Sequence, residues 1–286
     1  MSEDLKLIKE LRDKTGAGFL DCKLSLKDNQ NDIEKAVDDL RKKGLAKATK
    51  KSSRLANEGA IGLYSNDNFT VIIKINSETD FSAKSGTFLD FIDNLGSLAL
   101  NTNDANLDVQ KFLNLKSNDK NISEMITEMI AKIGENIILS ELKVIEHKNN
   151  NVSYYVHNPY RTNVGKIISV IQFNSSSTDD EIIKLSKNIC MHIAALKPES
   201  IDKDGLSKDL VDKEIKIQKE LILSSGKPEN VIEKILEGKM KKFYSEITLM
   251  NQNFVLDPEK TVKQVIDDFN IKYSFELINF KLFTLN

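Results

Sequence analysis

The chain has 286 residues, of which 41 are Lys or Arg and 43 are Asp or Glu, so its formal net charge is −2. A chain of this length is expected to form about two domains, and 40% hydrophobic residues are enough for a buried core. The near-neutral charge excludes a protein that binds nucleic acid over its whole surface, although a local basic patch remains possible. The sequence has no run of about 18 apolar residues, and residues 1–16 lack the apolar segment of a secretory or transit signal. We therefore expect a cytoplasmic protein.

The sequence offers little chemistry for catalysis. The three histidines, His147, His157 and His192, lack the spacing that places metal ligands on one helix face, and His192 is expected to be structural. The two cysteines, Cys22 and Cys190, lie far apart and are expected to be reduced, half-buried thiols. No metal site and no cofactor is expected. These absences favour a binding protein over an enzyme.

Residues 1–44 predict three short helices with apolar residues on one face. The first ends at Gly16, the second follows Gly18, and the third begins at Asn31 or Asp32 and ends at Gly44. Residues 45–56 form a basic connector without aromatic residues. A linker helix with a solvated face is the simpler interpretation, and an RNA contact is the alternative.

From about residue 59 the apolar residues follow a strand pattern. Two hairpins, each followed by a long helix, are predicted at residues 60–65 with 69–77 before 87–101, and at 152–157 with 165–173 before 179–196. This repeated order indicates two related α+β subdomains. Between them we expect a helix over 121–133 and a strand over 137–148.

The segment 199–249 has a different pattern. It contains two amphipathic stretches separated by Ser225-Gly226-Lys227-Pro228, which predicts an antiparallel helical hairpin that projects from the body. After it, residues 261–269 predict one more helix. Residues 273–283 predict a last strand, which we expect to pair with the second sheet.

Seven stretches carry a resemblance that covers nearly the whole chain. They are residues 10–26, 32–44, 75–84, 131–137, 191–198, 225–243 and 257–262. Together and in this order they resemble the bacterial translation elongation factor Ts family. The resemblance implies an α+β fold with four parts, namely a three-helix domain of the ubiquitin-associated type with its basic linker, two core subdomains and a helical hairpin. Their expected bounds are 1–55, 56–144, 145–199 with 250–286, and 200–249.

The resemblance implies that the chain is a guanine-nucleotide exchange factor for elongation factor Tu and not an enzyme. It would bind elongation factor Tu with GDP and hold the nucleotide-free form until GTP binds, with no cofactor and no contact to membrane or nucleic acid. The family places a Thr-Asp-Phe turn, here Thr79, Asp80 and Phe81 followed by Ser82, against the magnesium and phosphate site of the GTPase. We expect Phe81 to act as an apolar wedge between partner helices and Asp80 to fix its orientation.

The residues themselves are compatible with this role of the turn. It lies between a strand end and a helix start, in a Ser- and Gly-rich segment that can present a side chain outward. From the sequence alone, however, Phe81 tucked under its own helix is the simpler interpretation. If the partner binds its nucleotide with a nanomolar dissociation constant, the binding free energy is about 12 kcal/mol. Burying one Phe contributes only about 1.5–3 kcal/mol. The wedge therefore needs an extended interface around it.

Further contacts with elongation factor Tu are implied at five positions. Phe19 and Leu20 resemble the surface of the N-terminal domain that meets the GTPase, although Leu20 in the local core is an equal alternative. Ile133 and Gly134 resemble the segment that supports the turn, where Gly permits close backbone approach. His157 resembles a contact to a second domain of the partner, and an ordinary surface His is its alternative.

The chain departs from the family pattern at three places. Ser82 stands where the family often has Val, residues 157–166 are expected to form a longer loop, and a C-terminal helical module is expected to be missing. The main alternative function is an RNA- or ribosome-associated protein that uses the small N-terminal domain and the basic segment 41–54. A steep salt dependence of RNA binding would favour it, and the absence of interleaved aromatic residues argues against it. A hydrolase or transferase would need a nucleophile–base pair, which we do not find.

Overall fold

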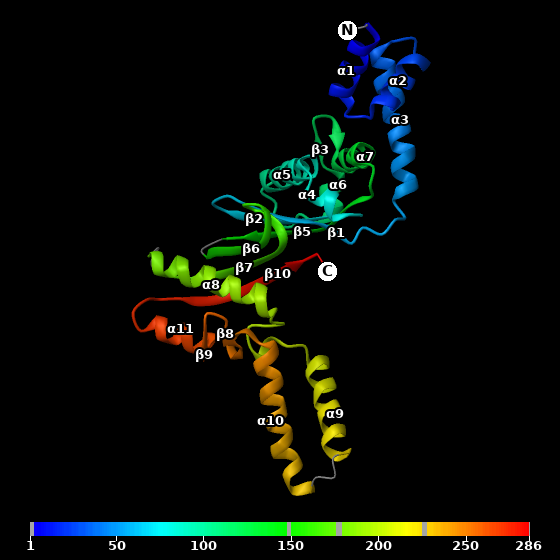
Figure 1. Ribbon diagram of the computed structural model, residues 1–286. Helices are drawn as coiled ribbons and strands as arrows, with labels where there is room; N and C mark the ends of the chain where they lie inside the picture. Colours follow the sequence, from blue (N-terminus) through cyan, green and yellow to red (C-terminus); the bar gives the residue numbers. More distant parts are fainter. Residues whose placement is uncertain (1–2, 148–149, 176–178, 225–227, 286) are drawn as a thin grey trace. The chain divides into compact units, whose positions relative to one another are not determined.

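The computed structural model describes residues 3–147, 150–175, 179–224 and 228–285 (Figure 1). The chain divides into two compact units, Met1–Glu146 with Asn158–Lys166 and Thr284–Asn286, and His147–His157 with Ile167–Phe283. Both units combine helices with antiparallel strands, which confirms the predicted α+β class. Within the described residues, no helix is both long and apolar enough to cross a membrane. The finer division into four parts stays a prediction.

The N-terminal segment of the first unit folds into helices where they were predicted. They are α1 (Glu3–Thr15), α2 (Phe19–Asp28) and α3 (Ile33–Lys51). Their apolar faces meet in a small core of Ile8, Leu11, Cys22, Leu26 and Ala36. The buried Ser25 hydroxyl lies 2.6 Å from Asp39 Oδ2 and 3.0 Å from the Ala36 carbonyl oxygen, so it links α2 to α3.

The predicted end of the third helix at Gly44 is wrong, because α3 continues to Lys51. Gly44 is buried against α7 (Ile122–Ile133), where an added Cβ would lie 2.8 Å from the Cβ of Ala131. This glycine therefore permits two helices to approach closely instead of ending one of them. The first part of the basic connector is consequently the last turns of α3.

The core of the first unit is an antiparallel sheet with helices on one face (Figure 1). Its strands are β1 (Glu58–Ser65), β2 (Phe69–Ser77) and β5 (Ile137–Glu146) in the order β1-β2-β5, and the start of β7 (Val164–Asn174) pairs with β1. The helices are α4 (Asp80–Lys84), α5 (Gly86–Asn101), α6 (Val109–Asn114) and α7. The predicted first hairpin and its long helix are thus confirmed, whereas α4, α6 and the small ladder of β3 (Lys116–Ser117) with β4 (Lys120–Asn121) were not predicted.

The expected long loop at 157–166 is also wrong. Strand β6 (Asn151–Arg161) extends well past His157, and only two residues separate it from β7. The polar residues of this stretch hid the strand from its sequence pattern. In the first unit, Arg161 donates to Asp93 over 2.5 Å and to Asp90 over 2.6 Å, so the end of this hairpin is tied to α5 by two ion pairs.

The second unit repeats the plan of strands with a covering helix. Its elements are β6, β7, α8 (Asp180–Leu196), α11 (Val262–Asn270) and β10 (Glu276–Thr284), with a short ladder of β8 (Asn253–Phe254) and β9 (Asp257–Thr261). Strand β10 lies next to β7, as predicted. His192 is buried on α8, where its Nε2 lies 3.0 Å from Gln252 Oε1 and its Nδ1 accepts from the Val255 amide at 3.2 Å. This confirms that His192 is structural.

The predicted helical hairpin is confirmed by α9 (Lys208–Ser224) and α10 (Glu229–Ile247), which lie side by side (Figure 1). Residues 225–227 of the expected helix break lie outside the described residues. Both cysteines are free, as expected, but they are fully buried and not half-buried.

Candidate functional site

Thr79, Asp80 and Phe81 form the start of helix α4. Thr79 caps the helix, because its hydroxyl oxygen accepts a hydrogen bond from the Ser82 amide at 3.2 Å. The Phe81 side chain is 85% exposed, so the alternative in which it packs under its own helix is wrong. Leaving a Phe in water forgoes about 1.5–3 kcal/mol of burial. An apolar side chain held out in this way is available to a partner surface.

Glu135 holds the cap residue from the opposite side. Its Oε2 accepts from the Thr79 amide at 3.0 Å, and its Oε1 accepts from the Thr79 hydroxyl at 2.7 Å. Hydrogen bonds to an ionised carboxylate are stronger than neutral ones. The beginning of α4 is therefore fixed by one side chain that follows helix α7.

The chain around Glu135 is itself tied down. Gly134 ends α7 in the left-handed region with φ of 86°, and its carbonyl oxygen accepts from the Lys51 ammonium group at the end of α3. The Asn136 amide donates to Glu78 Oε1 at 2.7 Å, and Glu78 also pairs with Arg54 over 3.4 Å. The Asn136 hydrogen bond holds the pKa of Glu78 below its usual value. These contacts connect the linker after α3 to the base of α4.

Asp80 pairs with Lys84 one turn later in the same helix, with 2.8 Å between Nζ and Oδ2. The hydrogen bond from Lys84 lowers the pKa of Asp80, and the same bond raises the pKa of Lys84. The Lys84 ammonium group also lies 5.9 Å from the centre of the Tyr160 ring. Asp80 therefore stabilises α4 itself and leaves the Phe81 ring uncovered.

Ser82 points into the protein and away from the exposed face of α4. It is buried, and among the described residues its hydroxyl has no hydrogen-bond partner. A side chain without a hydroxyl would therefore lose no hydrogen bond at this position. A contact of the Ser82 side chain with a partner stays a prediction.

The remaining predicted residues occupy other elements. Phe19 and Leu20 lie on α2 with 46% and 66% of their surfaces exposed, so the alternative of Leu20 in the local core is wrong. Ile133 is partly buried and packs against the core of the first unit. His157 belongs to the second unit, where it is exposed with its Nδ1 3.3 Å from the Tyr155 hydroxyl. The structure thus brings Gly134 together with Thr79 through Glu135, and it leaves Phe19 and Leu20 on the N-terminal helices.

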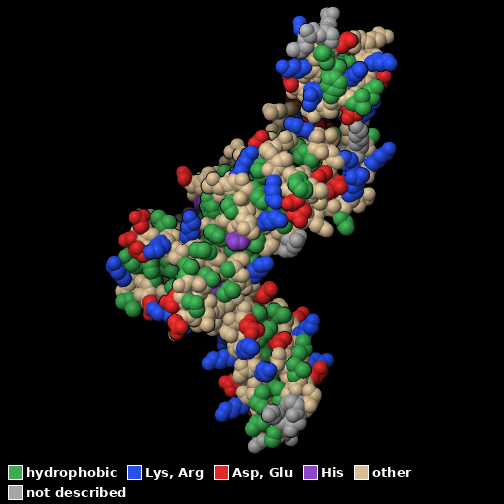
Figure 2. Space-filling view, viewed as in Figure 1, with side chains coloured by type: hydrophobic (Ala, Val, Ile, Leu, Met, Phe, Trp, Pro, Cys, Tyr) green, Lys and Arg blue, Asp and Glu red, His purple; other side chains and the backbone are tan. Residues whose placement is uncertain are grey.

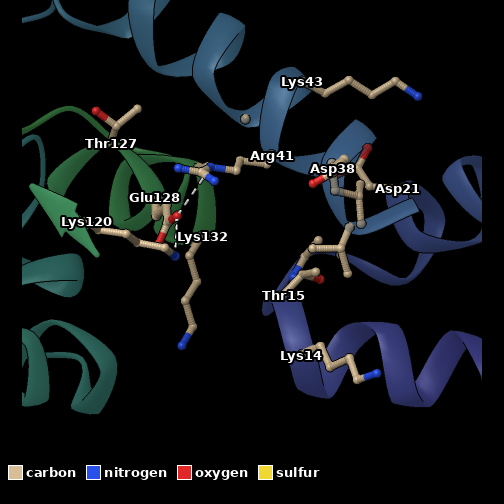
Figure 3. Close-up of a pocket in the computed structure, with 16 residues that line it drawn as sticks. Lys14, Thr15, Asp21, Asp38, Arg41, Lys43, Lys120, Thr127, Glu128 and Lys132 are labelled. Atoms are coloured by element: carbon tan, nitrogen blue, oxygen red, sulfur yellow. Dashed lines mark hydrogen bonds and ion pairs between the residues drawn. The ribbon is translucent and has the colours of Figure 1, made fainter. Parts of the chain in front are cut away.

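A cavity of about 250 Å³ lies elsewhere in the first unit, between the N-terminal helices and α7 (Figure 3). Both acidic and basic side chains line it. Among them, Glu128 pairs with Lys120 over 2.6 Å and with Arg41 over 3.8 Å. None of the residues from Thr79 to Ser82 lines it. In the part of the chain that the structure describes, no group of three His, Cys, Asp or Glu residues could hold a metal ion. The exposed α4 is therefore the better candidate for the functional site.

The sequence pattern did not predict the roles of Glu135 and Glu78. A signal was present, because Glu135 directly follows the helix-ending Gly134 and precedes a strand. In an antiparallel register with residues 69–77, that position faces Thr79. The partner strands could not be assigned from one sequence, so this signal could not be used.

Comparison with known proteins gives consistent matches. Residues 78–286 match the family model described as Elongation factor TS, and the match begins directly before Thr79. The chain is 39% identical over 272 residues to "Elongation factor Ts" of Rickettsia prowazekii, which covers 95% of this chain and 87% of that protein. It is 40% identical over 266 residues to the protein of that name from Methylobacterium radiotolerans, covering 93% and 85%. For the one from Magnetococcus marinus the identity is 37% over 267 residues, covering 93% and 86%.

Proposed function

Because the chain belongs to the elongation factor Ts family, we propose that it is the guanine-nucleotide exchange factor of elongation factor Tu in translation elongation. It binds the GDP-bound partner, inserts the start of α4 near the magnesium and phosphate site, and holds the nucleotide-free form until GTP binds. The observation that carries this proposal is the exposed Phe81 on a short helix whose N-cap residue, Thr79, is held by Glu135.

Exchange by this route requires a difference in affinity and no chemistry. A factor that binds the empty partner more tightly than the loaded one must weaken nucleotide binding by the same factor. A nucleotide held with a nanomolar dissociation constant has a binding free energy of about 12 kcal/mol. Burial of the Phe81 ring against the partner contributes about 1.5–3 kcal/mol toward offsetting it. The other exposed residues, Phe19, Leu20 and His157, are proposed to supply separate parts of the interface. The protein therefore acts through binding and not as an enzyme.

The arrangement of α4 suits a wedge that works without refolding. Phe81 is already held outward, so its insertion costs little additional ordering of the backbone. Asp80 is proposed to act through Lys84, because that ion pair stiffens the helix that carries Phe81. Ile133 and Gly134 support the same helix through Glu135. The displaced partner segment then loses its hold on Mg²⁺ and phosphate.

The structure weakens the argument for an RNA-binding linker. Lys51 binds the Gly134 carbonyl oxygen and Arg54 pairs with Glu78, so two of its basic residues have partners within the protein. In the view of Figure 2, Lys and Arg side chains are interspersed with Asp and Glu over both units. We therefore propose a partner protein and no nucleic acid, no membrane and no cofactor, with a cytoplasmic location like that of the translation machinery.

The test is the release of fluorescent GDP from purified elongation factor Tu, followed by stopped flow. We expect Phe81→Ala to slow the stimulated release about 10- to 100-fold, because the burial of its ring is lost. Ile271→Ala is the matched control, since Ile271 is equally exposed at 86% but lies in the second unit. Full stimulation by Phe81→Ala would remove the wedge from the mechanism. Tight, steeply salt-dependent RNA binding without any effect on GDP release would favour the alternative function.

A further inference from the structure

Two carboxylates extend the pairing of β2 and β5 beyond the end of the sheet. The last backbone pair is Ser77 with Ile137, and the same register then places Glu78 opposite Asn136 and Thr79 opposite Glu135. At these two positions a side-chain carboxylate, instead of a backbone carbonyl, accepts the hydrogen bond from the opposite amide. Glu78 accepts from the Asn136 amide at 2.7 Å, and Glu135 accepts from the Thr79 amide at 3.0 Å. These paired contacts therefore end at Thr79, the residue that caps the start of α4.

Glu135 also determines the direction of the Thr79 hydroxyl. A hydroxyl has one proton to donate, and here it is donated to Glu135 Oε1 over 2.7 Å. The oxygen lone pairs are then free to accept from the Ser82 amide, which is the capping bond of α4. A helix as short as Asp80–Lys84 is not stable by itself in water. Its first turn, which contains Phe81, therefore depends on the cap and on the carboxylate that orients the cap.

We propose that Glu135 is a positioning residue for nucleotide exchange. By accepting from both donors of Thr79, it fixes the first turn of α4 and holds the Phe81 ring outward in the orientation that enters the partner. Without it, an apolar ring with 85% of its surface in water is free to fold back onto nearby apolar surface. This inference rests on the proposed function, and it assigns to Glu135 no contact with partner or nucleotide.

The first test compares exchange in two backgrounds. Glu135→Ala is expected to lower the rate of GDP release at saturating factor about tenfold, because the orientation of Phe81 that enters the partner is then less populated. In the Phe81→Ala background the same substitution is expected to have no further effect, because Glu135 acts through Phe81. If Glu135 had a merely structural role, its replacement would lower the rate of GDP release by the same factor in both backgrounds. Glu135→Gln keeps one acceptor oxygen and is expected to restore part of the rate.

The matched control is Glu141→Ala, because Glu141 lies on β5, the strand that follows Glu135, and pairs with Lys74 over 3.6 Å. We expect wild-type exchange and an unchanged melting temperature for this variant. If Glu135→Ala does not fold, Thr79→Val replaces it, since valine has the shape of threonine without the hydroxyl. Wild-type exchange by either Glu135→Ala or Thr79→Val would overturn the proposal, as would an equal loss in both backgrounds.

A second readout does not need the partner. The sequence contains no Trp, so Phe81→Trp places a single indole at the exposed position. Its time-resolved fluorescence anisotropy is expected to show faster local rotation of the indole when Glu135→Ala is added. Adding Glu141→Ala instead is expected to leave the rotation as slow as in Phe81→Trp alone. Equal rotation with and without Glu135 would overturn the proposal. If the wild-type chain itself leaves GDP release unchanged, the proposed function is wrong; if wild type and Glu135→Ala work equally well, only the role of Glu135 is wrong.

Discussion

Replacing Gly96 by Ala tests how closely helix α5 packs on strand β1. A Cβ atom at Gly96 would lie 2.0 Å from Cε2 and 2.2 Å from Cδ2 of the Tyr64 ring, so the ring has to move. Its position is constrained, because the Tyr64 hydroxyl donates to Asp93 over 2.8 Å and Asp93 also accepts from Arg161. Burial, followed by the hydrogen bond to Asp93, raises the pKa of Tyr64. The ring cannot leave without giving up this partly buried hydrogen bond.

The expected loss of stability follows from three contributions. Ala is favoured over Gly in a helix interior by about 1 kcal/mol. Against this, a hydrogen bond to a charged acceptor contributes about 1.5–3 kcal/mol, and an extra methyl group in a packed core costs about 1–3 kcal/mol. We therefore expect Gly96→Ala to lower the free energy of unfolding by about 2–5 kcal/mol.

The assay is urea unfolding followed by far-ultraviolet circular dichroism. Gly238→Ala is the control, because Gly238 lies within α10 and an added Cβ there meets no atom within 4 Å. It should stabilise its helix by about 1 kcal/mol. In a Tyr64→Leu background, which lacks the ring atoms in question, Gly96→Ala should no longer destabilise. A neutral or stabilising effect of Gly96→Ala in the wild-type background would refute the reasoning.

Two further predictions concern buried titratable groups. Burial raises the pKa of Cys190 to about 12 and raises that of Cys22 as well, so neither thiol should react with a thiol reagent at mildly alkaline pH until the chain is unfolded; rapid labelling of the folded protein would contradict this. Burial lowers the pKa of His192 below 6.5, the value expected in the unfolded chain, and the Val255 amide that donates to its Nδ1 also favours the neutral ring. Because the unfolded chain takes up this proton first, the free energy of unfolding should fall as the pH decreases below 6.5, by at most about 1.4 kcal/mol per pH unit. Urea midpoints of the wild type and His192→Gln at several pH values measure this slope, which should be smaller in the variant.

The sequence predicted the order of the larger elements because each has a clear period. The hairpin of β1 and β2, the helices α5 and α8, and the pair α9 and α10 lie where their apolar patterns place them. The predicted end of α3 was wrong because a glycine in a helical pattern usually indicates the end of the helix. Only the contact of Gly44 with Ala131 shows why this glycine lies inside the helix. The strand at 152–157 was predicted, but its continuation to Arg161 was not, because the residues after His157 are mostly polar. These errors depend on contacts between residues distant in the sequence.

At the candidate site, too, the local pattern was predicted and the contacts between distant residues were not. The Thr-Asp-Phe pattern identified the right segment, but the exposure of Phe81 could not be read from its residue type, because a Phe beside a helix is usually buried. Ser82 was grouped with it, although the first turn of α4 directs that side chain inward. Glu135 could not be recognised without the register between β2 and β5. Side-chain direction and strand register were therefore the missing information.

The division of the chain has a consequence for its synthesis. The first unit takes residues Asn158–Lys166 from beyond the point where the second unit begins. A nascent chain released only as far as Glu146 has already made Asp90 and Asp93 but still lacks Arg161, the cation that they bind. The first unit therefore cannot acquire all its native contacts on the ribosome before the second has started to emerge, and a fragment cut after Glu146 would retain two neighbouring carboxylates without their counterion.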